Sequence, residues 1–181
     1  RLLEKTASRL GVSDTFGSVP NAICFDTTAG ADPYFNGAGP ARSACTKCGG
    51  CLTGCEYTAK NSLDKNYLYL AEKLGVKIFT ELKADRIEPL VGGGYQLLLR
   101  DTNAKKNYAT FSCAKLVLSA GVIGTLELLA KNREDHGTLP AISRSLGRVV
   151  RTNSEAITAV LHPPGIDLTE GTAISTDFYP D

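Results

Sequence analysis

The sequence of 181 residues has no methionine, no tryptophan and almost no net charge. Its 20 Lys and Arg side chains nearly balance 19 Asp and Glu side chains, which gives a formal charge of +1. This balance gives no electrostatic reason to expect nucleic acid or an anionic membrane as a partner. No apolar run approaches the roughly 20 residues that span a bilayer, and the first residues show no signal-peptide pattern. The composition, with 43% hydrophobic residues, is that of a globular domain without a membrane span.

The missing methionine also bears on the ends of the sequence. A complete translation product starts with Met, whereas this chain starts with Arg1, inside a helical pattern. We therefore expect an internal segment of a longer protein. Its length suffices for one domain of ordinary size, or slightly more than one.

Four of the six cysteines are concentrated in the stretch 45–65, CTKCGGCLTGCEYTAKNSLDK. Their C-x2-C-x2-C-x3-C spacing matches the bacterial ferredoxin run, in which the fourth cysteine serves a second cluster. No second run exists, so Cys24 or Cys113 would have to supply the missing ligand. Structural zinc more often uses two separated pairs of ligands. The pattern therefore favours a thiol-lined loop or a local disulfide. The alternative is an iron–sulfur cluster, whose candidate ligands are Cys45, Cys48, Cys51 and Cys55.

Cysteines that cluster in one loop are not a disulfide framework spread over the chain. This distribution predicts a reduced compartment, which we take to be the cytoplasm.

Hydrophobic periodicity predicts three helices and a series of short strands. The first helix covers 1–11, and the second, capped by Asn61 or Ser62, ends near Leu74. The third follows a glycine turn within 119–132, where a helix N-terminus offers free N–H groups. The predicted strands are 76–80, 85–90, 95–100, 108–112, 115–119 and 155–162, of which the second to fourth form an antiparallel meander.

Several stretches, taken in order, resemble one protein family. They are AKNSLDKNYL, GVKIFTELKADRI, GGGYQLLL, KLVLSAGVIGTLELL and TNSEAI. Together they resemble the glucose–methanol–choline (GMC) family of FAD-dependent oxidoreductases, and within it the cholesterol-oxidase-like branch. The resemblance covers roughly residues 40–181. Several members of that branch share a CxxCGxCxxGC loop before the helix, which favours a family loop over a metal site.

The resemblance implies an α/β (α+β) fold. The chain would be part of a FAD-binding Rossmann-like domain with an antiparallel β-meander, followed by the start of a substrate domain. It would divide into 1–60 (helix end, irregular segment and cysteine-rich loop), 61–150 (partial FAD-binding domain) and 151–181 (first part of the substrate-domain sheet). The residues implied to lie along FAD are Lys60, Asn61, Ala84, Ala120, Gly121, Gly124, Thr125 and Asn153.

The implied activity is oxidation of a small-molecule alcohol, sterol-like in this branch, by hydride transfer to FAD. The sequence has neither the G-x-G-x-x-G segment that binds the FAD pyrophosphate nor the C-terminal His and Asn (or second His) that act on the hydroxyl. We therefore expect no catalytic residue in this chain and no activity from it alone. We also expect self-association through the edge of the strand 115–119. The competing hypotheses are an iron–sulfur electron-transfer module and a small α/β interaction domain.

Overall fold

The computed structural model describes residues 2–25, 30–104, 108–151, 153, 155–157, 164–165 and 171–179. They belong to two compact units, which are described separately. Unit 1 comprises residues 1–77 and 160–181, and unit 2 comprises residues 78–159. The domain boundaries predicted after residues 60 and 150 stay a prediction.

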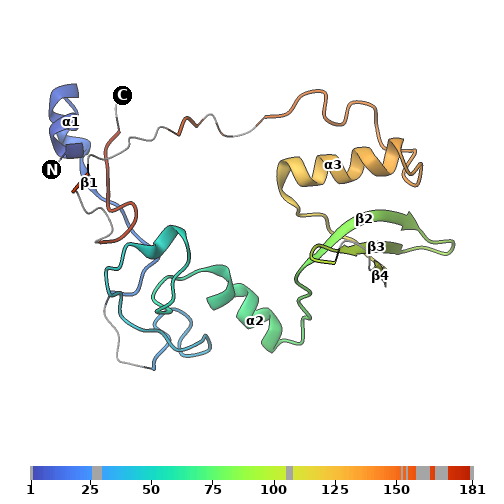
Figure 1. Ribbon diagram of the computed structural model, residues 1–181, viewed down its shortest axis with the longest axis horizontal. Coiled ribbons are helices and arrows are strands. Elements are labelled where there is room, and N and C mark those ends of the chain that lie inside the picture. The colour runs from blue at the N-terminus through green and yellow to red at the C-terminus, as the bar shows by residue number, and fades with distance from the viewer. Residues whose placement is uncertain are drawn as a thin grey trace. The chain divides into compact units, whose positions relative to one another are not determined.

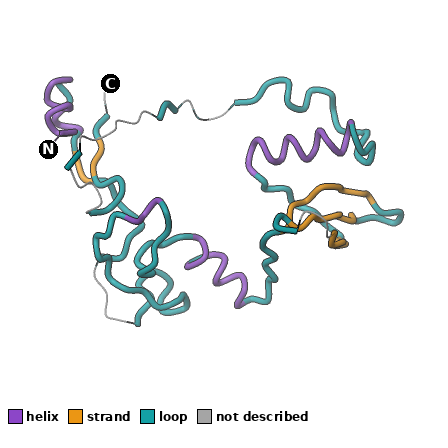
Figure 2. Tube along the Cα trace, in the orientation of Figure 1, coloured by secondary structure: helices purple, strands orange, loops and turns teal. Residues whose placement is uncertain are grey.

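Unit 1 consists mainly of loops and short helices (Figures 1 and 2). The predicted first helix is confirmed, although most of its apolar face is exposed and only Ala7 is buried. A two-stranded antiparallel ladder joins the beginning of the chain to residues near its end. The elements are α1 (Leu2–Leu10), α2 (Tyr67–Lys73), β1 (Gly17–Ser18), β5 (Thr176–Asp177) and 3₁₀ helices at Ser13–Thr15, Gly50–Leu52 and Leu63–Lys65.

Helix α2 starts later than the sequence indicates. Ser62 precedes the 3₁₀ helix Leu63–Lys65 and makes no side-chain capping bond to it. Asn66 is the N-cap instead, because its side-chain oxygen accepts the N–H of Tyr67. The predicted cap at Asn61 or Ser62 is therefore wrong by one turn. The predicted end is right, since Gly75 follows the helix with a positive φ.

Unit 2 contains the predicted antiparallel meander. Strands β2 (Leu82–Pro89), β3 (Tyr95–Asp101) and β4 (Tyr108–Cys113) pair in sequence order. The turn between β2 and β3 needs glycine at Gly94, where φ is +87° and a Cβ would lie 2.6 Å from the backbone oxygen of Cys113. The pairing register shifts between Ala84 and Arg86, which marks a bulge beside the predicted cofactor residue.

Three other predicted strands are not confirmed. Residues 76–80 and 115–119 have no ladder partner among the described residues. An extended segment without a partner gains no ladder hydrogen bonds, so its apolar pattern alone does not make a strand. Val117 is accordingly 84% exposed. Of the predicted strand 155–162, residues 155–157 are irregular and the rest lies outside the described residues.

Helix α3 (Gly121–Glu134) packs against β2 through a buried asparagine. Asn132 is 0% exposed, and its Oδ1 accepts the N–H of Ile87 at 2.8 Å. Its Nδ2 donates to the backbone oxygens of Asp85 at 3.2 Å and Leu128 at 2.8 Å. The hydroxyl of Thr138 donates to the same Oδ1 at 3.0 Å. Asn132 thus fixes the position of α3 on the sheet edge, beside the buried Ile87.

We expect Asn132→Ala to lower the free energy of unfolding by roughly 2–4 kcal/mol, because it leaves buried backbone donors and acceptors unpaired. The matched control is Asn103→Ala, at an exposed turn position, which should change stability by less than about 0.5 kcal/mol. Urea denaturation of the two variants measures the difference. Equal stability of both variants would contradict this role for Asn132.

Candidate functional site

In unit 1, the residues after the cysteine run are held by a short antiparallel pairing. Ile23 and Lys60 form a β-bridge, with the N–H of Cys24 bonded to Ala59 O at 2.9 Å. The N–H of Asn61 donates to Ala22 O at 2.8 Å. This pairing fixes the backbone of both residues that the sequence predicts to approach the flavin.

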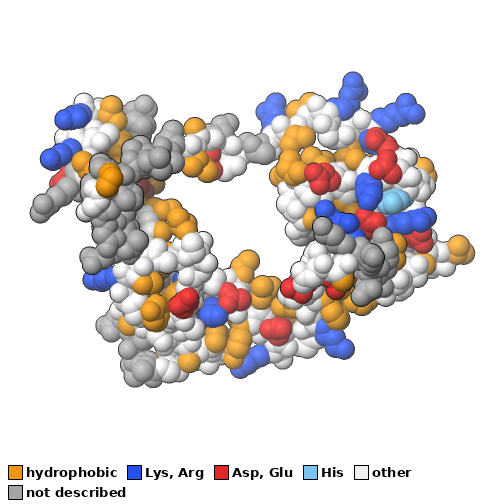
Figure 3. All heavy atoms as spheres, in the orientation of Figure 1, with side chains coloured by type: hydrophobic (Ala, Val, Ile, Leu, Met, Phe, Trp, Pro, Cys, Tyr) orange, Lys and Arg blue, Asp and Glu red, His pale blue; other side chains and the backbone are white. Residues whose placement is uncertain are grey.

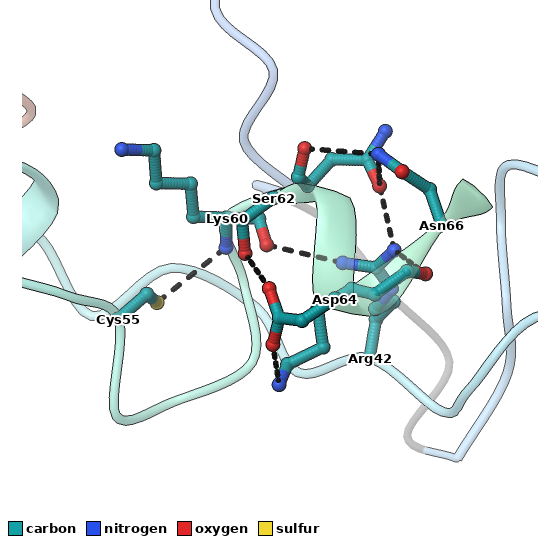
Figure 4. A network of polar contacts seen from close by, with 8 residues as sticks. Arg42, Cys55, Lys60, Ser62, Asp64 and Asn66 are labelled. Atoms are coloured by element: carbon teal, nitrogen blue, oxygen red, sulfur yellow. Dashed lines mark hydrogen bonds and ion pairs between the residues drawn. The ribbon is translucent and has the colours of Figure 1, made fainter. Parts of the chain in front are cut away.

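Arg42 organises the same turn from inside (Figure 4). Its side chain is 1% exposed, and its guanidinium donates to Lys60 O at 3.1 Å, Asn61 Oδ1 at 2.6 Å and Lys65 O at 2.7 Å. The ring of Tyr34 lies 5.2 Å from the guanidinium carbon. Arg42 is in no ion pair within the described ranges. Uncharged oxygens therefore hold this buried charge, and they keep the turn 60–65 in one conformation.

The cysteine run surrounds a small cavity next to Lys60. Cys45, Cys48, Cys51 and Cys55 all line it. The backbone N–H of Lys60 donates to Cys55 Sγ at 3.4 Å, and Lys60 Nζ donates to Cys51 O at 2.7 Å. Partial burial raises the pKa of the Cys55 thiol, but N–H groups of Lys60, Tyr57 and Ala59 and the Lys60 charge bring that pKa below its usual value. These neighbours favour the thiolate form of Cys55 relative to its thiol.

All six cysteines lie among the described residues, and none of them is in a disulfide. Within the described residues, no group of three His, Cys, Asp or Glu side chains is placed to hold a metal ion. The iron–sulfur hypothesis gains no support from this arrangement.

In unit 2, a cavity of about 530 Å³ is lined by residues of β2, β3 and α3 and by the residue before α3. Ala84, Ala120 and Gly124, three of the predicted cofactor residues, line it. A Cβ on Gly124 would lie 3.3 Å from the Cβ of Ala120, so glycine keeps this wall open. The structure thus brings together a strand residue, Ala84, and a residue at the start of a helix, Ala120, that are 36 residues apart in sequence.

Both basic and acidic side chains line that cavity. Lys131 Nζ bonds Asp85 Oδ1 at 2.5 Å, and this hydrogen bond holds the pKa of Asp85 below its usual value. Lys83, Arg100 and Glu127 also line the cavity. Basic and acidic side chains are mixed on the face of unit 2 shown in Figure 3. The lining of the cavity therefore combines cationic side chains, such as Lys83 and Arg100, with the small residues Ala84, Ala120 and Gly124.

The remaining predicted cofactor residues lie apart from this cavity. Gly121 and Thr125 line a second cavity of about 660 Å³, with Val149, Val150 and Arg151. Thr125 Oγ1 accepts the N–H of Ala120 at 3.2 Å, which fixes the turn into α3. Asn153 is exposed in an irregular segment. Lys60 and Asn61 belong to unit 1 and are described only within it.

Sequence reasoning missed Arg42 and Asn132. Arg42 has no periodic or motif signal, because its acceptors are backbone oxygens that sequence does not reveal. Asn132 had a readable signal: it follows Leu128 and Leu129 at helical spacing, so a polar residue interrupts the inner face of α3. An amide at such a place indicates a buried hydrogen-bonding role.

Comparison with known proteins decides the family. The family model for the N-terminal domain of GMC oxidoreductases matches residues 3–142 of this chain. The chain belongs to the GMC oxidoreductase family. It is similar to a cholesterol oxidase of Acinetobacter baumannii, with 39% identity over 194 residues, covering 99% of this chain and 35% of that protein. Cholesterol oxidases from two strains of Mycobacterium tuberculosis are 39% identical over 192 residues, covering 99% of this chain and 33% of theirs.

This membership confirms the predicted family and the α/β fold class, because the N-terminal GMC domain is a FAD-binding Rossmann-like domain. The chain spans about a third of the length of these relatives. The residues of unit 2 fit part of a FAD site. They provide a cavity that a Cβ at Gly124 would narrow, with cationic side chains at its edge. In the described part of this GMC chain, no helix has both the length and the apolar character needed to cross a membrane.

We expect Arg42→Met to destabilise unit 1 by roughly 2–3 kcal/mol, because the acceptors at 60, 61 and 65 lose their buried donor. Hydrogen–deuterium exchange should speed up at residues 60–66. The matched control is Arg144→Met, because this arginine is exposed and its side chain forms no hydrogen bond or ion pair with another described residue. If exchange at 60–66 were the same in both variants, Arg42 would not organise the turn.

Proposed function

We propose that this chain belongs to a FAD-dependent oxidoreductase that oxidises the CH–OH group of an alcohol, with sterols as the candidate class. The observation that carries the proposal is the cavity of unit 2, where Ala84, Ala120 and Gly124 converge. The names of the similar proteins, all cholesterol oxidases, support the substrate class. When bound, FAD would supply the two-electron chemistry by accepting hydride from the alcohol carbon.

The residues of this chain would bind and orient the cofactor. Small side chains at Ala84 and Gly124 would let a flat group approach the backbone of β2 and α3. Lys83 and Arg100 would lie near an anionic part of the cofactor, as their places at the cavity suggest. In unit 1, Arg42 would keep Lys60 and Asn61 in a fixed conformation, which lowers the entropy lost on binding. Gly121, Thr125 and Asn153 complete the proposed set.

The chain supplies no catalytic base in this proposal. Neither His136 nor His162 has a nucleophile or an orienting acid near it in sequence. We propose that these 181 residues alone do not oxidise an alcohol, and that the protein carrying them works in the cytoplasm.

The direct test uses the protein as it is encoded. It should purify with, or take up, FAD, whose absorbance near 450 nm should bleach when a 3-hydroxysterol or a simpler alcohol is added without oxygen. Absence of flavin binding would overturn the proposal. Flavin binding without bleaching by any alcohol tested would overturn the substrate class alone.

Gly124→Val tests the cavity itself. The Cβ of a valine there would lie only 3.3 Å from Ala120 Cβ, and its two methyl groups add further bulk. FAD affinity should therefore fall at least about tenfold, or about 1.4 kcal/mol. The matched control is Gly17→Val, where a Cβ meets nothing within 4 Å and φ is not positive. Fluorescence titration with FAD measures both affinities. Equal affinities would contradict the assignment of this cavity.

We also propose that the segment 115–119 associates with another strand. Val117 is exposed, and no strand pairs with this apolar segment in the described residues. Sedimentation of the 181-residue chain should show oligomers, and Val117→Lys should reduce them. A monomer at all concentrations would contradict this proposal.

A further inference from the structure

The four thiols of the cysteine run share one confined space that the proposed flavin function does not use. The cavity between Cys45, Cys48, Cys51 and Cys55 measures about 10 Å³, which is at most the room of one water molecule. Ile23, Tyr57 and Ala59 are among the other residues that line it. The sulfurs are therefore gathered around a small, largely apolar space, and none of the four is in a disulfide.

One of these sulfurs is favoured as the nucleophile by its neighbours. Cys55 Sγ accepts the backbone N–H of Lys60 at 3.4 Å. The ammonium of the same residue is fixed by its 2.7 Å bond to Cys51 O, so a positive charge stays within the loop. A peptide N–H and a nearby cation both stabilise a thiolate relative to a thiol. Cys55 is only partly buried, which leaves it open to a small solute.

The other three cysteines provide the second thiol that Cys55 needs to form a disulfide. Cys48 is exposed, and Cys45 and Cys51 are partly buried. All three line the same cavity as Cys55, on a short loop whose turns include Gly49 and Gly54 at positive φ. A second thiol at the same cavity can complete a disulfide after a small local movement of such a loop.

We propose that Cys55 is the peroxide-reactive thiolate of a reversible thiol–disulfide site, with one of the three cysteines at its cavity as the resolving thiol. This inference does not depend on the flavin assignment. The oxidant is a hydroperoxide, with hydrogen peroxide as its simplest member.

The reaction has two steps. The Cys55 thiolate attacks one peroxide oxygen, so an S–O bond forms and the O–O bond breaks. Hydroxide leaves, the sulfur is oxidised by two electrons, and the peroxide is reduced. The resolving thiol gives its proton to hydroxide and attacks the Cys55 sulfur. The S–S bond forms, the S–O bond breaks, and the second hydroxide leaves and becomes water on protonation. A dithiol such as dithiothreitol reverses the result.

The experiment treats the reduced protein, as encoded, with hydrogen peroxide, then alkylates the remaining thiols and maps the peptides by mass spectrometry. We expect a disulfide between Cys55 and Cys45, Cys48 or Cys51, reversed by dithiothreitol, with Cys113 still alkylated. The mapping uses the unmodified sequence, so it does not depend on a variant folding. Failure to find Cys55 in a disulfide or as a sulfenic acid would overturn the inference.

Serine variants distinguish the peroxide-reactive thiolate, Cys55, from the resolving thiol. In Cys55→Ser, we expect at least a tenfold slower loss of thiols from the loop, whereas the control Cys113→Ser should leave the rate unchanged. In the serine variant of the resolving cysteine, Cys55 should stop at a sulfenic acid, which a dimedone-type probe labels. Equal thiol loss in Cys55→Ser and the unmodified protein would overturn the proposal. So would bound zinc or iron, found by elemental analysis of the purified protein, that protects the four thiols from peroxide.

Discussion

The hydrogen bonds of Asn132 are the interaction on which the structure of unit 2 most depends. A meander of three strands has two edges and little apolar area, and of its side chains whose burial the structure describes, only Ile87 and Leu99 are buried. The side-chain amide of Asn132 joins β2 to α3 through Ile87 and Asp85, so the helix has a single position on the sheet. That position places Gly124 and Ala120 opposite Ala84. The cavity is therefore a consequence of the same amide.

Unit 1 also depends on the hydrogen bonds of a buried polar side chain, and here that side chain is the charged Arg42. Arg42 is among the largest fully buried side chains of the described residues, together with Ile87 and Asn132. It binds backbone oxygens of the turn 60–65, where an apolar residue could fill space but could not satisfy those acceptors. A guanidinium has five donors in a fixed plane, which suits a turn with several inward carbonyls. Specific hydrogen bonds thus hold both units where the apolar core is small.

The family and the larger elements could be predicted from the sequence. Local signals were strong at α1, at α3 and in the meander, where alternation and the glycines 92–94 agree. The segments 76–80 and 115–119 were predicted wrongly because their apolar pattern describes a strand only if a partner strand is present. The start of α2 was missed because Asn66, one turn further on, provides the cap.

The residues of the candidate site could likewise be predicted only in part from the sequence. Ala84, Ala120 and Gly124 were predicted through their places in family-like stretches, and they do line one cavity. Arg42 could not be found in this way, because its role depends on carbonyls 18 to 23 residues further along the chain. The spacing of the cysteines indicated a shared location for the sulfurs. It did not indicate which sulfur accepts the N–H of Lys60.

We propose that the beginning of α3 and the adjoining part of β2 contact FAD. Hydrogen–deuterium exchange of the encoded protein, with and without FAD, tests it most directly. Exchange should be slower in the presence of FAD at residues 82–85 and 120–125, with no change at the turn 90–94. Unchanged exchange at both of the first two segments, in a sample shown to bind FAD, would contradict the claim.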